Sequence, residues 1–176
     1  FSEGLTLDIP IVKKEWILEQ SEGLIVLLGL HSDVGQALCS SVPQKADTLI
    51  EDWINTFGNR VYLAITRTGR PNEELFLQHA CQLAQKYHIG VVAHNDLRFI
   101  KQEDFEAHEA RVCIAEGYVL GDDRRPRLYT DQQYFKTTAE MEALFADIPQ
   151  AIENSFHIAQ RCTVDLTLGE NYLPDY

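Results

Sequence analysis

The sequence lacks the closely spaced cysteine pairs that are typical of structural metal sites and redox motifs. It also lacks the long apolar runs of a membrane protein. Its four cysteines, Cys39, Cys81, Cys113 and Cys162, are widely spaced and form no CxxC pair, which excludes a zinc knuckle and a common redox motif. Each lies in an apolar stretch, so we expect buried free thiols in a reducing compartment. No apolar run approaches the roughly 18 residues of a membrane span, so no membrane partner is expected.

Basic residues are also scarce. Fifteen Lys and Arg stand against 27 Asp and Glu, which gives a formal net charge of −12 over 176 residues. Nucleic-acid-binding surfaces are usually basic, because much of the affinity comes from neutralising phosphates. We therefore expect little direct DNA contact. Arg124, Arg125 and Arg127 are the exception, and we predict that they form an interaction surface; a solvated loop or a structural anchor is the alternative interpretation.

Several catalytic signatures are missing as well. The chain contains no GxSxG, no P-loop, no GxGxxG and no HxH motif. His108 and Glu109 begin a string that looks like HExxH, but Val112 occupies the position of the second histidine, which excludes a zincin helix. The function therefore has to be sought in less local patterns.

The sequence does have apolar strands that alternate with helical segments. We predict strands at 23–30, 60–66 and 89–95. Their central parts, 24–28, 61–65 and 89–93, carry almost no polar residues, which is typical of strands buried on both faces, as in parallel sheets. Helical spacing predicts helices at 11–20, 32–40, 44–57, 72–88, 102–117, 137–147 and 148–162. We also predict a loop that contains one helical turn at 125–136 and a short strand at 164–168.

Residues that begin or end helices support these boundaries. Ser32 and Asp33 are predicted N-caps, and Gly58 is a predicted helix stop. Pro71 and Pro149 are predicted first helical residues, and Thr138 begins a weak capping pattern. The result is an α/β fold in which parallel strands alternate with helices through right-handed crossovers.

Ligands in such folds bind at the carboxyl ends of the strands, so the residues that follow the three strands form a candidate rim. Histidine and carboxylate side chains there can bind a divalent metal ion and activate water. Polar residues at strand ends also commonly cap neighbouring helices, and this alternative stays open. The rim residues are His31, Asp33, Thr66, Arg67, His94, Asn95, Asp96 and Arg98.

Three parallel strands alone leave long unpaired edges. The start at Phe1 and the abrupt end at Tyr176 also predict a segment of a longer protein whose missing strands lie upstream. We therefore expect the chain to associate with itself through strand edges, or its terminal residues 163–176 to fold back over the gap.

Long strings at 91–120 and 125–162, together with the terminal LPDY, closely resemble the PHP (polymerase and histidinol phosphatase) domain of bacterial DNA polymerase III alpha subunits. The resemblance extends from about Trp16 to Tyr176. It implies that residues 1–117 are the second half of a (β/α)7-type PHP barrel. Residues 118–176 would be a helical extension that leads towards the polymerase palm.

The resemblance also implies a degenerate metal site. Metal-binding members have N-D-x-H-[YF] with Asp and His as ligands, whereas this chain keeps Asp96 and has Arg98 at the His position. A guanidinium stays protonated and has no free lone pair for a cation, so Arg98 would replace the metal electrostatically and pair with Asp96. Ala64 stands where the family tends to carry an acid. His31, His94 and Asn95 are the possible auxiliary ligands.

The leading hypothesis is a non-catalytic PHP segment of a bacterial, cytoplasmic replicative DNA polymerase, a nucleotidyltransferase. The resemblance implies a scaffold role towards two partners, the remainder of the alpha subunit and the proofreading exonuclease subunit. It implies Mg²⁺ for the parent polymerase and no cofactor in this segment. The alternative is a metal-dependent phosphoesterase, a 3′–5′ exonuclease or pyrophosphatase with Zn²⁺ or Mn²⁺. A third reading is a stand-alone binding module.

Overall fold

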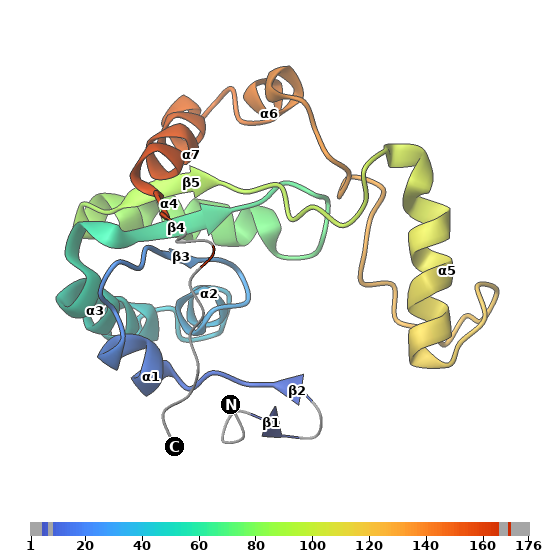
Figure 1. The fold of residues 1–176 in the computed structure, drawn as a ribbon, viewed down its shortest axis with the longest axis horizontal. Helices are drawn as coiled ribbons and strands as arrows, with labels where there is room; N and C mark the ends of the chain where they lie inside the picture. The colour runs from blue at the N-terminus through green and yellow to red at the C-terminus, as the bar shows by residue number, and fades with distance from the viewer. Residues whose placement is uncertain (1–4, 7–8, 166–168, 170–176) are drawn as a thin grey trace.

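The computed structural model describes residues 5–6, 9–165 and 169, with two sheets and helices around the larger one (Figure 1). The strands are β1 (Leu5–Thr6), β2 (Ile9–Pro10), β3 (Val26–Leu28), β4 (Val61–Ile65) and β5 (Gly90–Ala93). The α-helices are α1 (Lys14–Glu19), α2 (Asp33–Leu38), α3 (Lys45–Phe57), α4 (Glu73–Tyr87), α5 (Phe105–Glu116), α6 (Thr138–Leu144) and α7 (Pro149–Arg161). Two 3₁₀ helices, η2 (Gly58–Arg60) and η3 (Gln102–Asp104), precede β4 and α5.

The three predicted strands are confirmed, and they pair in parallel in the order β3-β4-β5. The mixture of a parallel sheet with intervening helices agrees with the predicted α/β class. The sheet is small, and β1 and β2 form a separate antiparallel pair.

The crossover helices α2, α3 and α4 pack against one face of this sheet. Leu28, Leu63 and Ala93, which lie on that face of β3, β4 and β5, form one buried cluster with Ile50 of α3 and Phe76 of α4. The cluster forms because each helix buries an apolar stripe at helical spacing, as the sequence predicted.

The opposite face is covered chiefly by α7. Tyr62, Ala64 and Val92 alternate with the residues of the first face and are buried together with Ile158 of α7. All five residues of β4 are buried, as predicted, but Leu27 of β3 is 45% exposed. The prediction that each strand is buried on both faces is therefore wrong for β3, because the cover from α7 reaches β5 and β4.

Helix α7 also occupies the outer edge of β5 (Figure 1). The Asn154 amide donates a hydrogen bond of 2.8 Å to the carbonyl oxygen of Val91. A Cβ on Gly90 would lie 2.7 Å from the Tyr62 ring and 3.3 Å from the Asn154 amide nitrogen, so only glycine fits there. A side-chain amide thus satisfies a backbone acceptor that a further strand would otherwise pair.

Most helix ends agree with the sequence. Ser32 caps α2 through a hydrogen bond to the Gly35 N–H, Gly58 ends α3 with φ of 55°, and Pro149 opens α7. Two assignments are wrong. Asn72 is the N-cap of α4, so Pro71 lies outside the helix, and the capping box of α6 uses Thr137 with Glu140 rather than Thr138.

Three further sequence predictions are corrected or limited. The segment 125–136 forms no helical turn; it contributes an isolated bridge between Phe99 and Tyr134. Residues 164–165 are not a strand, and 166–168 lie outside the described residues. All four cysteines are free, but Cys162 is exposed and Cys113 alone is fully buried. None of the described helices is both long and apolar enough to cross a membrane.

Helix α5 stands apart from the sheet, beyond the carboxyl ends of the strands (Figure 1). An aromatic cluster joins it to the rim: the His108 ring lies 5.4 Å from the Phe99 ring and 4.7 Å from the Tyr129 ring, centroid to centroid. The side of α5 away from this cluster is open, and Ile114 is 82% exposed.

The exposed Leu27 side chain predicts concentration-dependent self-association of the chain. In sedimentation velocity at several concentrations we expect the average mass to rise, because burying this face removes apolar surface from water. Leu27→Asp should shift the population towards monomer, whereas Leu120→Asp, which changes a side chain of similar exposure beyond α5, should not. A monomer at every concentration in the unmodified chain would contradict this prediction.

Candidate functional site

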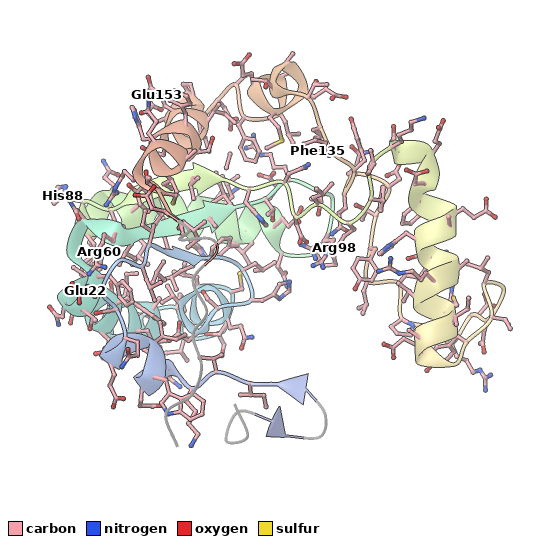
Figure 2. All side chains as sticks on the ribbon, viewed as in Figure 1. Glu22, Arg60, His88, Arg98, Phe135 and Glu153 are labelled. Atoms are coloured by element: carbon pink, nitrogen blue, oxygen red, sulfur yellow. The ribbon has the colours of Figure 1, made fainter. Side chains whose placement is uncertain are left out.

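The carboxyl ends of the three strands bring the predicted rim segments together. The peptide N–H of His94 donates 2.8 Å to the carbonyl oxygen of Ile65, so the segment after β5 continues beside the one after β4. A fourth segment, 129–136, joins them through the bridge between Phe99 and Tyr134. The labelled Arg98 lies at this end of the sheet, on the side that faces α5 (Figure 2).

Asp96 is the centre of the rim. Its Oδ1 pairs with Arg98 Nη2 at 2.9 Å, and its Oδ2 pairs with Arg70 Nη2 at 2.5 Å. The buried Gln133 amide adds a hydrogen bond of 2.9 Å to Oδ2. Asp96 has φ of 46°, a left-handed conformation that is uncommon for residues other than glycine. The backbone is thus held in a costly conformation that lets one carboxylate meet two guanidinium groups and an amide.

Glu73, at the start of α4, is the most deeply buried acid of the rim, with 3% of its surface exposed. Its Oε2 accepts the backbone N–H groups of Thr68 and Gly69 at 2.6 and 2.9 Å. Its Oε1 accepts the hydroxyls of Thr66 and Thr68 at 3.0 and 2.6 Å. Burial alone would raise the pKa of this carboxyl. The hydrogen bonds from Thr68 and Thr66 and the charge of Arg70 outweigh burial, so the pKa lies below its ordinary value.

The side chain of Arg67, in the same loop, points in another direction and binds the connection between α6 and α7. Its Nη1 and Nη2 donate to the two oxygens of Asp147 at 2.6 and 2.8 Å, and Nη1 also donates to the Leu144 carbonyl at 2.7 Å. The bond from Arg67 lowers the pKa of Asp147. This fork-to-fork geometry is the strongest form of a guanidinium–carboxylate pair.

The segment 129–136 is fastened to the rim by buried polar side chains. The main-chain carbonyl oxygen of Gln133 accepts the main-chain N–H of Arg98 at 2.9 Å, and the Asn95 side-chain amide donates to the main-chain carbonyl of Tyr134 at 2.7 Å. Lys136 donates to the Gln132 carbonyl and lies 3.5 Å from the Asn95 side-chain oxygen. Burial lowers the pKa of Lys136. These contacts cross the predicted boundary between 117 and 118.

The donor set around Asp96 does not fit a divalent metal ion. Both of its oxygens already accept protonated or amide donors, and Asn95, a predicted auxiliary ligand, is engaged with the 129–136 segment. His94 is exposed at the end of β5, and His31 lines a separate cleft with arginines. In the part of the chain that the structure describes, no three His, Cys, Asp or Glu side chains gather closely enough to hold a metal ion.

That cleft lies beside the Asp96 network and has a volume of about 590 Å³. Residues from α2 and its C-cap, from the loops after β3, β4 and β5, and from the loop before Thr130 form its walls. They are Leu30, His31, Gln36, Cys39, Arg70, Pro71, Asn72, Arg98, Arg127, Leu128 and Tyr129.

The three arginines of the RRPR string have separate roles. Arg125 is only 8% exposed and pairs with the buried Glu109 of α5, so it is an anchor and not part of an interaction surface. Arg124 is exposed and binds the carboxylate of Asp122, while Arg127 lines the cleft. The predicted surface is therefore corrected for Arg125, because its charge is neutralised inside the molecule.

Sequence reasoning missed Arg70, Glu73, Gln133 and Tyr129. Glu73 lies inside the helix predicted at 72–88, and no site role was predicted for it. The Thr-rich loop ahead of it was the available signal, because hydroxyls and consecutive backbone N–H groups are the natural donors for a buried carboxylate. Gln133 lies 37 residues from Asp96, and no local pattern joins the two.

We predict that Glu73→Gln lowers the free energy of unfolding at pH 7 by about 2–4 kcal/mol. Glutamine has one carbonyl oxygen, so it can accept either from the backbone N–H groups of Thr68 and Gly69 or from the hydroxyls of Thr66 and Thr68, and its NH2 group replaces the other acceptor. Chemical denaturation measures the change. Glu74→Gln, the neighbouring exposed acid, is the control and should cost far less.

The difference in the free energy of unfolding between the unmodified chain and Glu73→Gln should become smaller at acidic pH. Because the folded pKa of Glu73 is lowered, its contribution is complete above the unfolded value of about 4.3 and is lost as the pH falls through the folded pKa. A glutamine does not titrate there. A stability difference that stays constant from pH 6 down to pH 3 would count against the network.

Known relatives cover the whole chain, although no family model matches it. The DNA polymerase III alpha subunit of Pseudomonas fluorescens is 48% identical over 177 residues, which is 100% of this chain and 15% of that subunit. The alpha subunit of Pseudomonas aeruginosa is 47% identical over the same length, and that of Escherichia coli is 45% identical over 95% of this chain. The chain spans about 15% of the length of these curated relatives, and it is homologous to one segment of the DNA polymerase III alpha subunit.

Proposed function

We propose that the chain is a non-catalytic PHP segment of a replicative DNA polymerase that serves as a scaffold during DNA replication. It packs against the rest of the alpha subunit and offers a surface to the proofreading exonuclease subunit. The homology to alpha subunits supports the assignment to the polymerase. The scaffold role rests on the chemistry of the rim.

The contact that carries the proposal is the pair of guanidinium groups on Asp96. Arg70 and Arg98 are bound to opposite oxygens of the same carboxylate. Arginine remains protonated at any pH that a cell maintains, and it offers no lone pair to a cation. Two fixed positive charges thus do the electrostatic work of a metal ion without its Lewis acidity. A rim neutralised in this way stabilises the fold and activates no water.

The topology supports the assignment to a β/α barrel of the PHP kind. Strands β3, β4 and β5 are neighbours in sequence order, and α2, α3 and α4 all lie on one face. Consecutive staves of a barrel have this arrangement, with helices outside and side chains of the other face inside. We propose that the face with Leu27 and Tyr62 is the inner face of such a barrel.

A scaffold needs rigid elements and surfaces that suit protein partners. The Glu73 and Asp96 networks supply the rigidity. Exposed apolar side chains supply the surface: Ile114 is 82% exposed, Val119 69% and Phe135 66%. Phe135 lies in the segment that leads to α6 (Figure 2). Together with the net charge of −12, these side chains favour protein partners over DNA, and Arg124 and Arg127 are the proposed polar part of the surface.

The alternative, a metal-dependent phosphoesterase, requires several ligands around two or three metal ions. Ala64 lies on the inner face of β4, where the family tends to carry an acid, and Arg98 holds the histidine position. No contact in the described residues favours this alternative, and we propose no cofactor for this segment.

We predict that the purified chain extends no primer and releases no nucleotide or phosphate with Mg²⁺, Mn²⁺ or Zn²⁺. Arg98→His should not create metal-dependent activity, because one histidine beside Asp96 does not complete a ligand set. Radiolabelled primer extension and phosphate release are the assays. Manganese-stimulated nucleotide release that disappears in Asp96→Ala would overturn the proposal.

The same variant tests the structural role of the pair. Asp96→Ala removes the carboxylate that accepts Arg70 Nη2 and leaves this guanidinium, whose side chain is 15% exposed, with only its longer carboxylate contact, to Glu73. The free energy of unfolding should therefore fall by about 3 kcal/mol. Asp123→Ala, an exposed acid, is the control. Thermal denaturation should give the same result with and without Mn²⁺ or Zn²⁺. A metal-dependent rise in melting temperature that requires Asp96 would show that the site still binds metal.

A further inference from the structure

Helix α5 and the residues that flank it form an arm, residues 101–128, which stands beyond the carboxyl ends of the strands (Figure 1). Main-chain contacts fix the base of this α5 arm. Phe99 forms an isolated bridge with Tyr134, and the Phe135 N–H donates to the Ile100 carbonyl oxygen at 3.1 Å. The helix itself is held to the body through side chains, so the strength of those side-chain contacts decides whether α5 stays in place.

An aromatic cluster makes this connection, and His108 of α5 lies in the middle of it. The centroid of the His108 ring is 5.4 Å from that of Phe99 and 4.7 Å from that of Tyr129, which it meets edge-on. Phe105, almost one turn earlier on α5, lies 5.9 Å from the Phe99 ring. Aromatic pairs at these distances attract each other beyond the area that they bury. His108 is therefore the ring that connects α5 to two different segments of the rim.

The His108 ring is held where a positive charge is unfavourable. Its Nε2 is buried and has no hydrogen-bond partner among the residues that the structure describes. A neutral imidazole can leave that nitrogen without a proton, whereas an imidazolium carries an N–H on both nitrogens. Protonation would thus place a charged N–H donor in a buried position without an acceptor, which is a costly arrangement.

Two cations near the ring act in the same direction as burial. Burial is the largest cause that lowers the pKa of His108 below its ordinary value of 6.5. Arg111, on α5, and Arg98, in the segment after β5, lower this pKa further because each repels a second positive charge. Arg98 is kept close to the cluster by stacking over the Tyr129 ring, 5.5 Å from its guanidinium carbon to the ring centroid.

The acids near His108 do not offset these effects. Glu109 raises the pKa of His108, but it is bound to Arg125 in a buried ion pair within the arm. Glu116, which lines the same small pocket as His108, is exposed to water, which screens its charge. Tyr129 packs on the ring from the segment before Thr130 and supplies no carboxylate. The net effect on the pKa of His108 is therefore downward.

We propose that the α5 arm is an acid-sensitive flap, which leaves the rim when His108 is protonated. In the closed arm the added proton meets no acceptor, whereas in the open arm the ring is surrounded by water. A proton that binds the open form better shifts the population towards it. The ion pair between Glu109 and Arg125 lies within the arm, so α5 and the loop after it move as one unit. This device goes beyond the scaffold role and requires no ligand.

The pH range follows from the direction of the shift. Because the pKa of His108 is lowered in the closed arm, the attachment has its full strength above the ordinary value of 6.5 and weakens as the pH falls below it. With no proton bound in the closed arm, the open population would rise about thirtyfold between pH 8 and pH 5. Protonation of the closed arm at lower pH makes the rise smaller. The carboxyl of Glu73, whose pKa is also lowered, stays ionised throughout this range.

The test is hydrogen–deuterium exchange of the chain between pH 8 and pH 5, with uptake corrected for the intrinsic exchange rate at each pH. We expect exchange in α5 to rise by about threefold to thirtyfold relative to α3. His108→Phe keeps an aromatic ring that takes no proton, so α5 should stay protected at pH 5. His157→Phe, which replaces an exposed histidine of α7, is the matched control and should behave as the unmodified chain does.

The comparison of α5 with α3 in the unmodified chain needs no variant, so it holds even where His108→Phe alters the packing of the cluster. Equal corrected exchange in α5 at pH 8 and pH 5 would overturn the proposal. An equal rise in α3 would do the same, because it reports general unfolding. A rise in α5 that persists in His108→Phe would assign the proton to another group and also contradict it. None of these outcomes bears on catalysis or on the scaffold proposal, which is judged separately.

Discussion

One buried carboxylate, that of Glu73, determines the geometry of the polar end of the sheet. Its oxygens collect the backbone N–H groups and hydroxyls of the loop after β4, and this fixes the two arginines of that loop in different directions. Arg67 reaches Asp147 beside α7, and Arg70 reaches Asp96. A charge buried without these donors would be strongly unfavourable, so the loop and the carboxylate each require the other.

Guanidinium–carboxylate pairs hold the loops of the rim together, as a bound metal ion could. A metal ion draws several oxygen or nitrogen ligands to one point, and it leaves when the ligands are protonated or chelated. A guanidinium is covalently attached and directional, so the loops it joins depend on no supply of ions. An arginine-based rim supplies cohesion without Lewis acidity, which suits the scaffold role that we propose.

The sequence predicted the elements better than the site. The three apolar runs were sufficient to identify β3, β4 and β5, because short runs of this kind between predicted helices favour buried strands. Asp96 and Arg98 are two residues apart, so their pairing followed from proximity. Three other features depend on the packing of segments that are distant in sequence. They are the packing of α7 over Tyr62, the hydrogen bond from Gln133 to Asp96 and the burial of Glu73. No local propensity encodes them.

Because α7 covers the outer edge of β5, that edge stays open until α7 has been synthesised. Asn154 lies 63 residues after Val91, the backbone group that it satisfies. At a synthesis rate of about 5–20 residues per second, β5 waits roughly 3–13 s for its partner to be translated. During that interval the outer edge of β5 is open, and the apolar face around Val92 has no cover. A nascent chain is most vulnerable to wrong strand pairing during that interval, which ends only when α7 has left the ribosome.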